Sequence, residues 1–338
     1  MSHLVITGGA GFIGSNFVNW LCQEHPEHDL VVVDLLTYAG NLANLESVLD
    51  QIRFEKADIA DTGAMRGILE GAAGVINFAA ESHVDRSLLS AAPFLHSNVT
   101  GVQVLLDLVR ELGIPRFLQI GTDEVYGSAP ADIRFSEGDH LNPSSPYAAS
   151  KASADLLVNA AVRTWDIPAL ITRASNNYGP WQFPEKLIPL MITNIVEEHP
   201  LPVYGDGLQT REWLHVIDHC AAVWAVWTEG KVGEIYNIGT GNDVANIDLV
   251  RTLIDLLGAS EDLLSYVEDR PGHDRRYALD ISKLTTELEW QPQISLEDGL
   301  NETIEWYRQN RPWWESIKSG EYREYYDRMY GDRDQLTE

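Results

Sequence analysis

Leu4-Val5-Ile6-Thr7-Gly8-Gly9-Ala10-Gly11-Phe12-Ile13-Gly14 is the stretch that decides the fold. Its first four residues are apolar or β-branched and predict a short strand, and the amphipathic segment 15–23 predicts a helix. The glycines at positions 8, 11 and 14 permit a tight turn, close approach of the backbone to a ligand and close packing of helix on strand. The helix then directs its free N–H groups toward bound phosphates. This stretch therefore predicts a strand–turn–helix unit that binds a nucleotide.

A second apolar strand, 30–33, ends in Asp34, which lies 20 residues past Gly14. An acid at this spacing can hold the ribose hydroxyls of a dinucleotide. Asp34 would repel a 2′-phosphate and no arginine follows nearby, so the sequence favours NAD over NADP. The residues of the turn that we expect to line the cofactor are Gly8, Gly11, Phe12, Ile13 and Gly14.

Strands and helices continue to alternate along the next part of the chain. Strands are predicted at 53–55, 74–78 and 116–120, and helices up to about residue 70 and over 92–112. Asp58 and Ile59 follow the first of these strands, and we expect them to flank the adenine. This alternation predicts an α/β fold built on a doubly wound parallel (Rossmann) sheet.

Thr122-Asp123-Glu124 directly follows the predicted strand 116–120. In open parallel sheets, ligands bind outside the carboxyl ends of the strands, which is where this triplet should lie. Two adjacent carboxylates are unfavourable to bury unless they are paired or take part in chemistry. Taken alone, such a triplet more often forms a solvated turn, so its weight depends on the residues that accompany it.

Tyr147 and Lys151 stand four residues apart near the start of a predicted helix that runs to about residue 165. Residues at this spacing project from one face of a helix. A phenol has an ordinary pKa of about 10 and is a poor base at neutral pH. A lysine ammonium and a positively charged nicotinamide ring nearby would lower that pKa. A surface Tyr and Lys would look the same, but beside the glycine-rich turn the pair predicts a catalytic base.

The net charge of −27 excludes some partners, and lysine supplies only six of the 24 basic residues. Such a surface should repel nucleic acid and anionic membranes. Halophilic proteins also use a high net charge, so a high-salt cytoplasm is our hypothesis for this chain.

The two cysteines, Cys22 and Cys220, stand in unrelated contexts and indicate neither a disulfide framework nor a metal site. His219 precedes Cys220, but neighbours on a helix point in different directions, so we interpret them as helix surface and core. No apolar run is long enough to span a membrane, and the chain starts directly with a strand. We therefore expect a metal-free protein in a reducing cytoplasm.

Beyond these features, the chain resembles the extended short-chain dehydrogenase/reductases and, within them, the dTDP-glucose 4,6-dehydratases. The resemblance covers essentially the whole chain. It rests on the segments 7–15, 36–42, 79–87, 122–127, 175–180, 183–189 and 269–277. The turn and the Tyr/Lys pair are shared with epimerases, whereas the Thr-Asp-Glu triplet and the last segment are more specific. Gly121 departs from the pattern, because the family usually has serine before this triplet.

The resemblance implies a mechanism that also suits the residue types. Tyr147, poised by Lys151 and hydrogen-bonded with Thr122, takes the proton from the sugar O4 while hydride leaves C4 for NAD⁺. Glu124 then removes the C5 proton and Asp123 protonates the departing C6 hydroxyl, one ionised base and one neutral acid. NADH returns its hydride to C6 and Glu124 reprotonates C5. NAD ends as it began and should behave as a tightly held prosthetic group.

The resemblance also assigns binding residues. Ala80, Tyr147, Lys151 and Asn177 join the cofactor site. Arginines suit a diphosphate because the planar guanidinium binds two oxygens, although any single one could form a surface salt bridge. Arg275 is a further candidate for this role. The residues expected to bind substrate are His83, Thr122, Asn176, Glu185, Lys186, Leu187, Pro202, Tyr204, Arg211, Asn246, Arg270 and His273.

We expect two lobes. Residues 1–173 and 214–240 should form the NAD-binding domain, and 174–213 with 241–338 a smaller, mixed α/β lobe for the sugar nucleotide. The C-terminal aromatic residues should pack a helix onto that lobe: Trp306, Tyr307, Trp313, Trp314, Tyr322, Tyr325, Tyr326 and Tyr330. The helices around 99–112 and 151–165 are apolar enough to pair with a partner's, which suggests a homodimer.

The main interpretation is therefore a lyase that acts on dTDP-glucose in deoxysugar (for example rhamnose) biosynthesis. A nucleotide-sugar 4-epimerase would share Tyr147 and Lys151 but would need no acid/base pair, so Asp123 and Glu124 argue against it. A non-catalytic NAD-binding regulator would tolerate the loss of these residues. The sequence leaves open whether the base is thymine or uracil, because the two differ by one methyl group.

Overall fold

The structure is a computed structural model that describes residues 3–319 of the 338 in the chain. It contains a seven-stranded sheet with the strand order β10-β6-β5-β4-β1-β2-β3, in which every neighbouring pair is parallel. This arrangement confirms the predicted doubly wound sheet. Its strands are β1 (His3–Thr7), β2 (Leu30–Asp34), β3 (Ile52–Lys56), β4 (Ala72–Asn77), β5 (Phe117–Thr122), β6 (Ala169–Ala174) and β10 (Ile235–Ile238).

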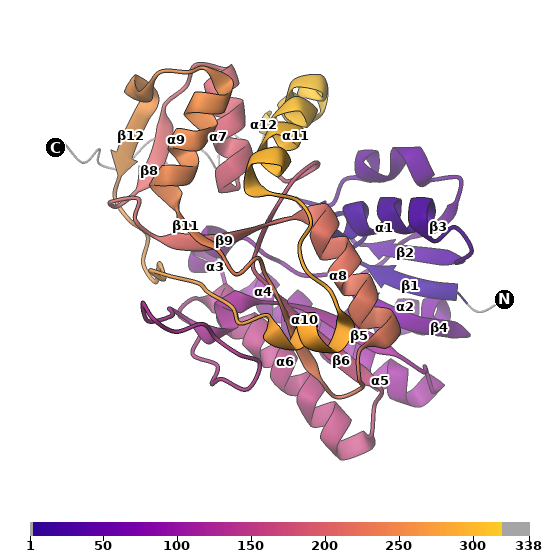
Figure 1. Cartoon of the computed structure of the whole chain (residues 1–338). Helices are drawn as coiled ribbons and strands as arrows, with labels where there is room; N and C mark the ends of the chain where they lie inside the picture. The colour runs from indigo at the N-terminus through magenta and orange to yellow at the C-terminus, as the bar shows by residue number, and fades with distance from the viewer. Residues whose placement is uncertain (1–2, 320–338) are drawn as a thin grey trace.

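Helices cover both faces of this sheet (Figure 1). Successive strand residues point to opposite faces, so Leu4 and Ile6 join one core and Val5 joins the other. Because both faces are buried, inner strands such as β2 and β4 are mostly apolar, whereas the edge strand β3 alternates between apolar and charged residues. One face carries α1 (Phe12–Glu24), α8 (Val216–Glu229) and α10 (Ser282–Leu288), and the other carries α2 (Thr62–Leu69), α5 (Val102–Leu112) and α6 (Pro146–Trp165).

The predicted helix over 92–112 is divided in the structure. It consists of α4 (Ala92–Leu95), a π-helical turn over His96–Gly101, and α5. Gly101 lies against Ile59, and a Cβ atom at Gly101 would be 2.5 Å from the Ile59 side chain. The predicted helical stretch is therefore confirmed, with a π-helical turn inside it that the sequence analysis did not predict. The start of α6 was predicted correctly: Ser145 caps it through the N–H of Ala148, with Pro146 in the first turn.

A second, smaller lobe lies at the top of Figure 1 and has its own hydrophobic core. It has a three-stranded sheet with one parallel and one antiparallel pair, and a separate parallel pair of strands. The mixed α/β character of this lobe is as predicted. Its strands are β7 (Asn176–Tyr178), β9 (Thr210–His215), β11 (Asp243–Ala245), β8 (Leu201–Tyr204) and β12 (Leu264–Val267). Its helices are α7 (Leu187–Val196), α9 (Asn246–Leu257), α11 (Leu296–Gln309) and α12 (Arg311–Lys318).

Short elements connect these parts: 3-10 helices over Leu42–Val48, Asp123–Tyr126 and Glu261–Leu263, and α3 (Val84–Leu89). Of the C-terminal aromatic residues, Tyr307 and Trp314 are buried in the core of the second lobe, and Trp306 and Trp313 pack against it. Tyr322, Tyr325, Tyr326 and Tyr330 lie outside the described residues.

The chain crosses between the lobes more than once. Strand β10 lies at the edge of the large sheet, beside β6. Leu284 and Trp290 also belong to the hydrophobic core on one face of that sheet. We therefore keep the division into 1–173 with 214–240, and 174–213 with 241–338, as a proposal, with residues 282–290 returning to the first lobe.

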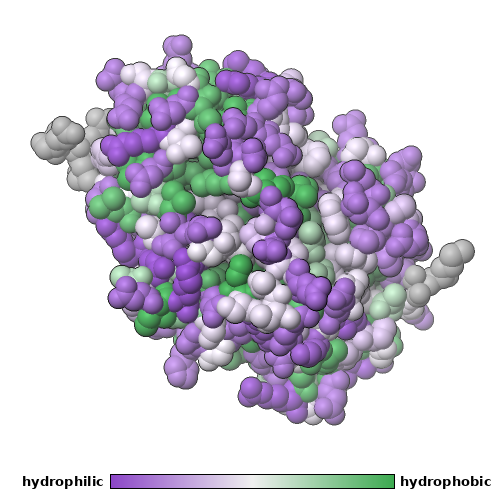
Figure 2. Space-filling view, in the orientation of Figure 1, coloured by the Kyte–Doolittle hydropathy of each residue, from purple (hydrophilic) through white to green (hydrophobic). Residues whose placement is uncertain are grey.

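Hydrophilic side chains cover most of the face of the molecule shown in Figure 2. Within residues 3–319, we find no helix with both the length and the apolar composition needed to cross a membrane.

Candidate active site

A cavity lies at the carboxyl ends of β1, β2 and β4, where the glycine-rich turn was predicted to bind a dinucleotide. Of the twelve residues predicted to bind the cofactor, all but Asn177 line this cavity. Those that line it are Gly8, Gly11, Phe12, Ile13, Gly14, Asp34, Asp58, Ile59, Ala80, Tyr147 and Lys151. We call it the dinucleotide cavity.

The turn is tightly packed because glycines exclude side chains from it. Gly8 has a φ of +68°, and a Cβ atom on it would lie 2.5 Å from the backbone nitrogen of Ala79. A Cβ atom on Gly14 would lie 2.2 Å from the carbonyl oxygen of Gly8. Only glycine fits these two positions, which brings the start of α1 close to the strand ends. The turn thus fits a pyrophosphate.

Asp34 is fixed by its neighbours. Its Oδ2 accepts a hydrogen bond from the Ala10 N–H at 2.9 Å, and its Oδ1 accepts one from the Leu36 N–H at 2.8 Å. Burial raises the pKa of this carboxyl, and the backbone N–H groups oppose that rise. At the far side, Asp58 lies 2.8 Å from Nε2 of His96. Both carboxyls line the dinucleotide cavity, as expected for residues that bind a ribose and an adenine.

Tyr38 and Phe183 also line the dinucleotide cavity and were not among the predicted site residues. Their rings meet edge to face with centroids 5.5 Å apart. The guanidinium of Arg86 lies 4.1 Å from the centre of the Tyr38 ring and donates to Glu185 at 3.0 Å. Both aromatic residues fall in segments that carry the family resemblance, so that signal was present in the sequence.

The five predicted catalytic residues come together at the end of β5 and the start of α6. The Thr122 hydroxyl lies 3.3 Å from Oδ1 of Asp123 and accepts from the Glu124 N–H at 3.3 Å. Thr122 also forms a side-chain hydrogen bond with Tyr147. The Lys151 ammonium donates to the carbonyl oxygen of Ile120 at 2.7 Å.

The two adjacent carboxyls have different electrostatic surroundings. Burial raises the pKa of Asp123 well above its ordinary value, and the charge of Glu124 raises it further. Burial also raises the pKa of Glu124, but Arg270, Lys186 and Arg211 lower it. The nearby cations therefore favour an ionised Glu124 beside a neutral Asp123.

The prediction for the pKa of Tyr147 concerns the enzyme with its cofactor bound, and it stays a prediction. We expected Lys151 and a bound nicotinamide to lower its pKa. In the chain alone, burial raises the pKa of Tyr147 above its ordinary value, and the charge of Glu124 adds to this effect. Burial also lowers the pKa of Lys151 to about 8. The phenolate is thus disfavoured without a bound cofactor, because burial and the charge of Glu124 outweigh the hydrogen bond with Thr122.

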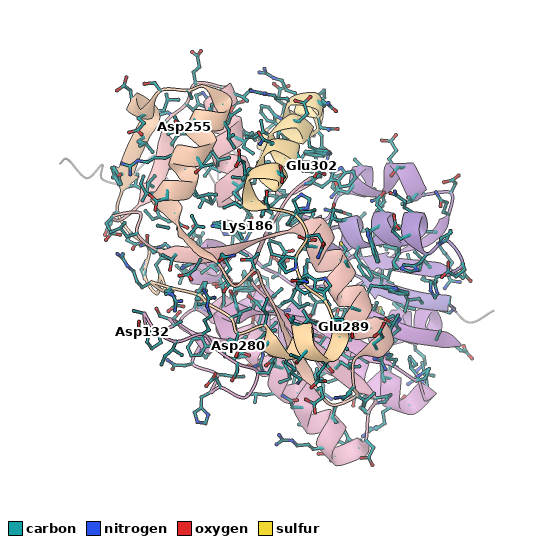
Figure 3. All side chains as sticks on the ribbon, viewed as in Figure 1. Asp132, Lys186, Asp255, Asp280, Glu289 and Glu302 are labelled. Carbon is teal, nitrogen blue, oxygen red and sulfur yellow. The ribbon has the colours of Figure 1, made fainter. Side chains whose placement is uncertain are left out.

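A second cavity adjoins the first and lies between the two lobes; we call it the sugar-nucleotide cavity. Glu185 and Lys186 line both cavities, and Lys186 is seen between the lobes in Figure 3. Glu124 also lines the second cavity. The predicted substrate residues that line it are His83, Asn176, Glu185, Lys186, Leu187, Pro202, Tyr204, Arg211, Asn246, Arg270 and His273. The remaining one, Thr122, lies beside Glu124 on the preceding strand.

Positive charge is concentrated in the sugar-nucleotide cavity. Arg211 is buried, donates to the carbonyl oxygens of Thr210 and Asp274, and lies 4.0 Å from the centre of the Tyr277 ring. Arg270 and Lys186 lie in the same cavity. Arg275 does not: its side chain is 53% exposed and forms an ion pair with Asp206 at 2.8 Å. Arg275 therefore forms a surface salt bridge and does not line the proposed diphosphate site.

Comparison with known proteins agrees with this geometry. A family model described as GDP-mannose 4,6 dehydratase matches residues 5–303. The dTDP-glucose 4,6-dehydratase of Streptomyces griseus is 48% identical over 320 residues, which is 94% of this chain and 97% of the relative. The chain belongs to the dTDP-glucose 4,6-dehydratase family.

Two further proteins are similar to this 4,6-dehydratase over most of its length. The low-salt glycan biosynthesis protein Agl12 of Haloferax volcanii is 49% identical over 306 residues, covering 90% of this chain and 98% of the relative. The crystal structure of DesIV, a dTDP-glucose 4,6-dehydratase from Streptomyces venezuelae with NAD and TYD bound, superposes with a TM-score of 0.91. It is 48% identical, and the match covers 94% of this chain and 100% of DesIV.

Some residues of this dehydratase's sugar-nucleotide cavity were missed by the sequence analysis. They include Asp85, Trp213 and Tyr277. Among the described residues, the buried Trp213 Nε1 finds no hydrogen-bond partner, so it is free to donate to a ligand. Strand alternation could have found it, because Arg211 and Trp213 are two apart on β9 and face the same side.

The cysteine and histidine residues set aside from the sequence are structural. Cys22 and Cys220 are free thiols, and burial raises the pKa of Cys220. His219 is fully buried rather than on the helix surface, and burial lowers its pKa to about 3. Over residues 3–319, no cluster of three His, Cys, Asp or Glu side chains could hold a metal ion.

Proposed function

We propose that this protein converts dTDP-glucose to dTDP-4-keto-6-deoxyglucose and water, as a 4,6-dehydratase that uses NAD in deoxysugar biosynthesis. The observation that carries the proposal is the position of three side chains relative to the two cavities. Tyr147 lines the dinucleotide cavity, Glu124 lines the sugar-nucleotide cavity, and Asp123 directly precedes Glu124 in the sequence. A base for O4 and an acid/base pair for water elimination thus meet where the two cavities adjoin.

The dinucleotide cavity fits NAD. Glycine at positions 8 and 14 lets the turn pack closely against the neighbouring backbone, which places the start of α1 at the cavity where a pyrophosphate would bind. Asp34 offers carboxylate oxygens to ribose hydroxyls and would repel a 2′-phosphate. When bound, NAD supplies the hydride acceptor for sugar C4 and the hydride donor for C6. The structures of related dehydratases with NAD bound support this cofactor.

The first proton to move is the one on the sugar O4. Tyr147 Oη takes it as general base, and the hydrogen bond from Thr122 favours the phenolate. Lys151 follows one turn later on α6, and its ammonium is oriented by the Ile120 carbonyl oxygen. Buried positive charge at this position opposes the desolvation that disfavours the phenolate.

Water elimination uses the two carboxyls. Glu124, whose ionised form the surrounding cations favour against burial, removes the proton at C5. Asp123, kept neutral by burial and by the charge of Glu124, donates its proton to the departing oxygen at C6. Glu124 then returns a proton to C5. A 4-epimerase has no use for this acid/base pair, which favours the dehydratase.

The remaining residues bind the nucleotide. Lys186, Arg211 and Arg270 supply positive charge for the diphosphate. Tyr204 offers an aromatic face to the base, with Pro202 beside it on β8. The names of related enzymes, and the TYD ligand of DesIV, support thymidine rather than uridine. The name of the Haloferax relative supports a role for the product in glycan synthesis.

The test is to incubate the purified protein with dTDP-glucose in D₂O without added NAD and to follow the product by mass spectrometry and NMR. We expect loss of one water and deuterium at C5. The galacto isomer at unchanged mass would instead establish an epimerase. No turnover even with added NAD and molar salt would reject the proposal for this substrate and direct the test to UDP- and GDP-glucose.

We further propose a cytoplasmic homodimer. The two cysteines are unpaired in the structure, which suits a reducing compartment. Leu95 on α4 and Leu156 on α6 are 52% and 60% exposed. Large apolar side chains this exposed on neighbouring helices support a partner on this face.

A further inference from the structure

The side chain of Asp85 reaches into the sugar-nucleotide cavity. Asp85 lies on α3, in the lobe that contains the large sheet, and only 5% of its surface is exposed. None of the roles described above uses this carboxylate. A buried negative charge is unfavourable without compensation, and it would repel the diphosphate that this cavity is built to bind. Its presence therefore requires a reason.

Two residues of the second lobe compensate this charge. The Tyr204 hydroxyl donates a hydrogen bond to Oδ2 of Asp85 at 2.9 Å. The Arg270 guanidinium lies 3.5 Å from Oδ1. Each oxygen of the carboxylate thus faces a different partner, and both partners are residues that would bind the nucleotide. Asp85 is the point at which the first lobe holds the binding groups of the second.

The hydrogen bond to Asp85 orients the Tyr204 ring. The other side of this ring meets His273 edge to face, with centroids 6.0 Å apart. His273 is itself held by Asp269 through Nδ1 at 2.6 Å. The ring therefore has a fixed plane before a base stacks on it, which reduces the entropy lost on binding.

The contact with Arg270 is of a different kind. Within the described part of the chain, the buried Nη1 of Arg270 makes no hydrogen bond, so 3.5 Å to Asp85 is an ion pair and not a hydrogen bond. Asp85 attracts the guanidinium into the cavity yet leaves the N–H donors of Nη1 unused. A diphosphate oxygen can take those donors without breaking a hydrogen bond to the protein.

We infer that Asp85 is a positioning residue for the nucleotide diphosphate: it holds the Tyr204 ring and the Arg270 guanidinium in the arrangement that binds the ligand. This inference rests on the proposed function for the identity of the ligand. It adds a role for Asp85 in ground-state binding, not in chemistry. A change at Asp85 should therefore alter KM and the affinity for dTDP and leave kcat nearly unchanged.

The experiment uses the full-length holoenzyme and the variants Asp85→Ala, Asp85→Asn, Tyr204→Phe and both double variants. KM and kcat are measured with dTDP-glucose, and the Kd of dTDP by calorimetry. We expect Asp85→Ala to raise KM and Kd by ~10-fold or more, with kcat within ~3-fold of wild type. Asp85→Asn keeps an oxygen acceptor for the Tyr204 hydroxyl and should recover part of the affinity.

The double variants separate positioning from a general effect on packing. If the Tyr204 hydroxyl acts through Asp85, Tyr204→Phe should weaken dTDP binding in the wild type but not further in Asp85→Ala. Asp132→Asn is the control, since Asp132 is exposed on a loop well away from Lys186 and the cavity (Figure 3). It should change neither KM nor Kd.

Several results would overturn the inference. They are an unchanged KM and Kd in Asp85→Ala, a fall in kcat without a rise in KM, or full additivity of the Asp85 and Tyr204 variants. If Asp85→Ala does not fold, the pair Asp85→Asn and Tyr204→Phe decides the same question. A wild type that binds dTDP but does not turn over dTDP-glucose would reject the proposed reaction, and the dTDP affinities would still decide the role of Asp85.

Discussion

A Cβ atom on Gly121 would lie 2.3 Å from the carbonyl oxygen of Thr172 on the adjacent strand. Real Cβ atoms essentially never come this close to another heavy atom, and the atom they would meet is backbone. Glycine at position 121 therefore allows β5 and β6 to approach closely just before Thr122. The family resemblance leads one to expect serine here, and the Cβ atom of a serine would clash with the Thr172 carbonyl oxygen in this structure.

Replacing Gly121 should disturb the site that follows it. We expect Gly121→Ser and Gly121→Ala to lower the free energy of unfolding by about 1–3 kcal/mol, because the strands must move apart. Turnover should fall as well, since Thr122 and Asp123 come next. Denaturant unfolding and kcat measure both effects. Gly67→Ala on α2 is the control: no described atom lies within 4 Å of a Cβ atom there, so a gain of about 0.5–1 kcal/mol is expected.

The two carboxyls should contribute opposite limbs to the pH–rate profile. The pKa of Glu124 is raised, so activity should fall as the pH drops through that raised value and the base becomes protonated. The pKa of Asp123 is raised well above its ordinary value, so activity should fall as the pH rises through that raised value and the acid loses its proton. Asp123→Asn should remove the alkaline limb and lower kcat by ~10²-fold or more.

Glu124→Gln supplies the complementary test. It should abolish the incorporation of deuterium at C5 from D₂O, whereas Asp123→Asn should still permit this exchange. Both are nearly isosteric changes, so circular dichroism should show an unchanged fold. Exchange at C5 that survives Glu124→Gln would assign the base to a different residue.

The site could be predicted from the sequence where its residues fall at strand ends. The turn at Gly8 and the acid at Asp34 follow from the periodicity of the chain, because parallel strands deliver their carboxyl ends to one edge of the sheet. Pattern alone did not establish the residues of the second lobe. Those came from the family resemblance, since Tyr204 and Arg270 stand far apart in sequence and meet only through tertiary packing.

What the sequence did not predict has physical reasons. Asp85 lies within a segment that carries the resemblance. An acidic residue at the start of a helix usually caps that helix or is exposed to solvent, so its sequence position did not indicate a binding role. The contacts that Asp85 makes depend on how the two lobes meet. The rise in the pKa of Tyr147 in the chain alone could not be predicted, because burial is a tertiary property. The π-helical turn at His96–Gly101 has the composition of an ordinary helix and shows no signal of its own.

Lys151 should have a measurable effect on stability. Its pKa is lowered by burial from 10.5 to about 8, so the folded NAD-free protein disfavours the ammonium. The unfolded state binds more protons between these two pH values, and stability should rise as the pH increases through this range. At pH 7 the wild type is destabilised by the full free energy that corresponds to this lowered pKa. We expect Lys151→Met to be inactive but more stable by about 1–3 kcal/mol at pH 7.

The comparison must be made across pH to identify the cause. The advantage of Lys151→Met should shrink as the pH rises from about 8 toward 10.5, because the wild-type lysine then becomes neutral in both states. Urea unfolding of the two proteins at several pH values gives this difference. A constant difference in the free energy of unfolding would attribute it to packing instead of charge.

Salt should stabilise this protein. The net charge is −27, and raising KCl from about 0.1 M to about 1 M shortens the Debye length from about 10 Å to about 3 Å. Repulsion between surface carboxylates falls accordingly, so Tm and activity should rise together. Asp132, Asp255 and Glu289 are exposed in separate parts of the molecule (Figure 3).

Changing these three residues to lysine adds six charges, from −27 to −21, and should reduce the dependence of Tm on salt. Calorimetry of both proteins over a KCl series measures this, with sucrose as a control for excluded-volume effects. Full activity and an unchanged Tm in low salt would argue against adaptation to a high-salt cytoplasm.

The last prediction concerns the proposed homodimer. Leu156 on α6 is 60% exposed, and helix α6 also carries Tyr147 and Lys151 on its buried side. A carboxylate at position 156 would have to lose its hydration to remain in a packed interface, which is strongly unfavourable. We therefore expect Leu156→Glu to sediment as a monomer under conditions in which the wild type is a dimer. Leu208→Glu is the matched control, because Leu208 is 47% exposed but lies in the second lobe. A monomeric wild type, or dissociation by Leu208→Glu alone, would contradict an interface built on α6.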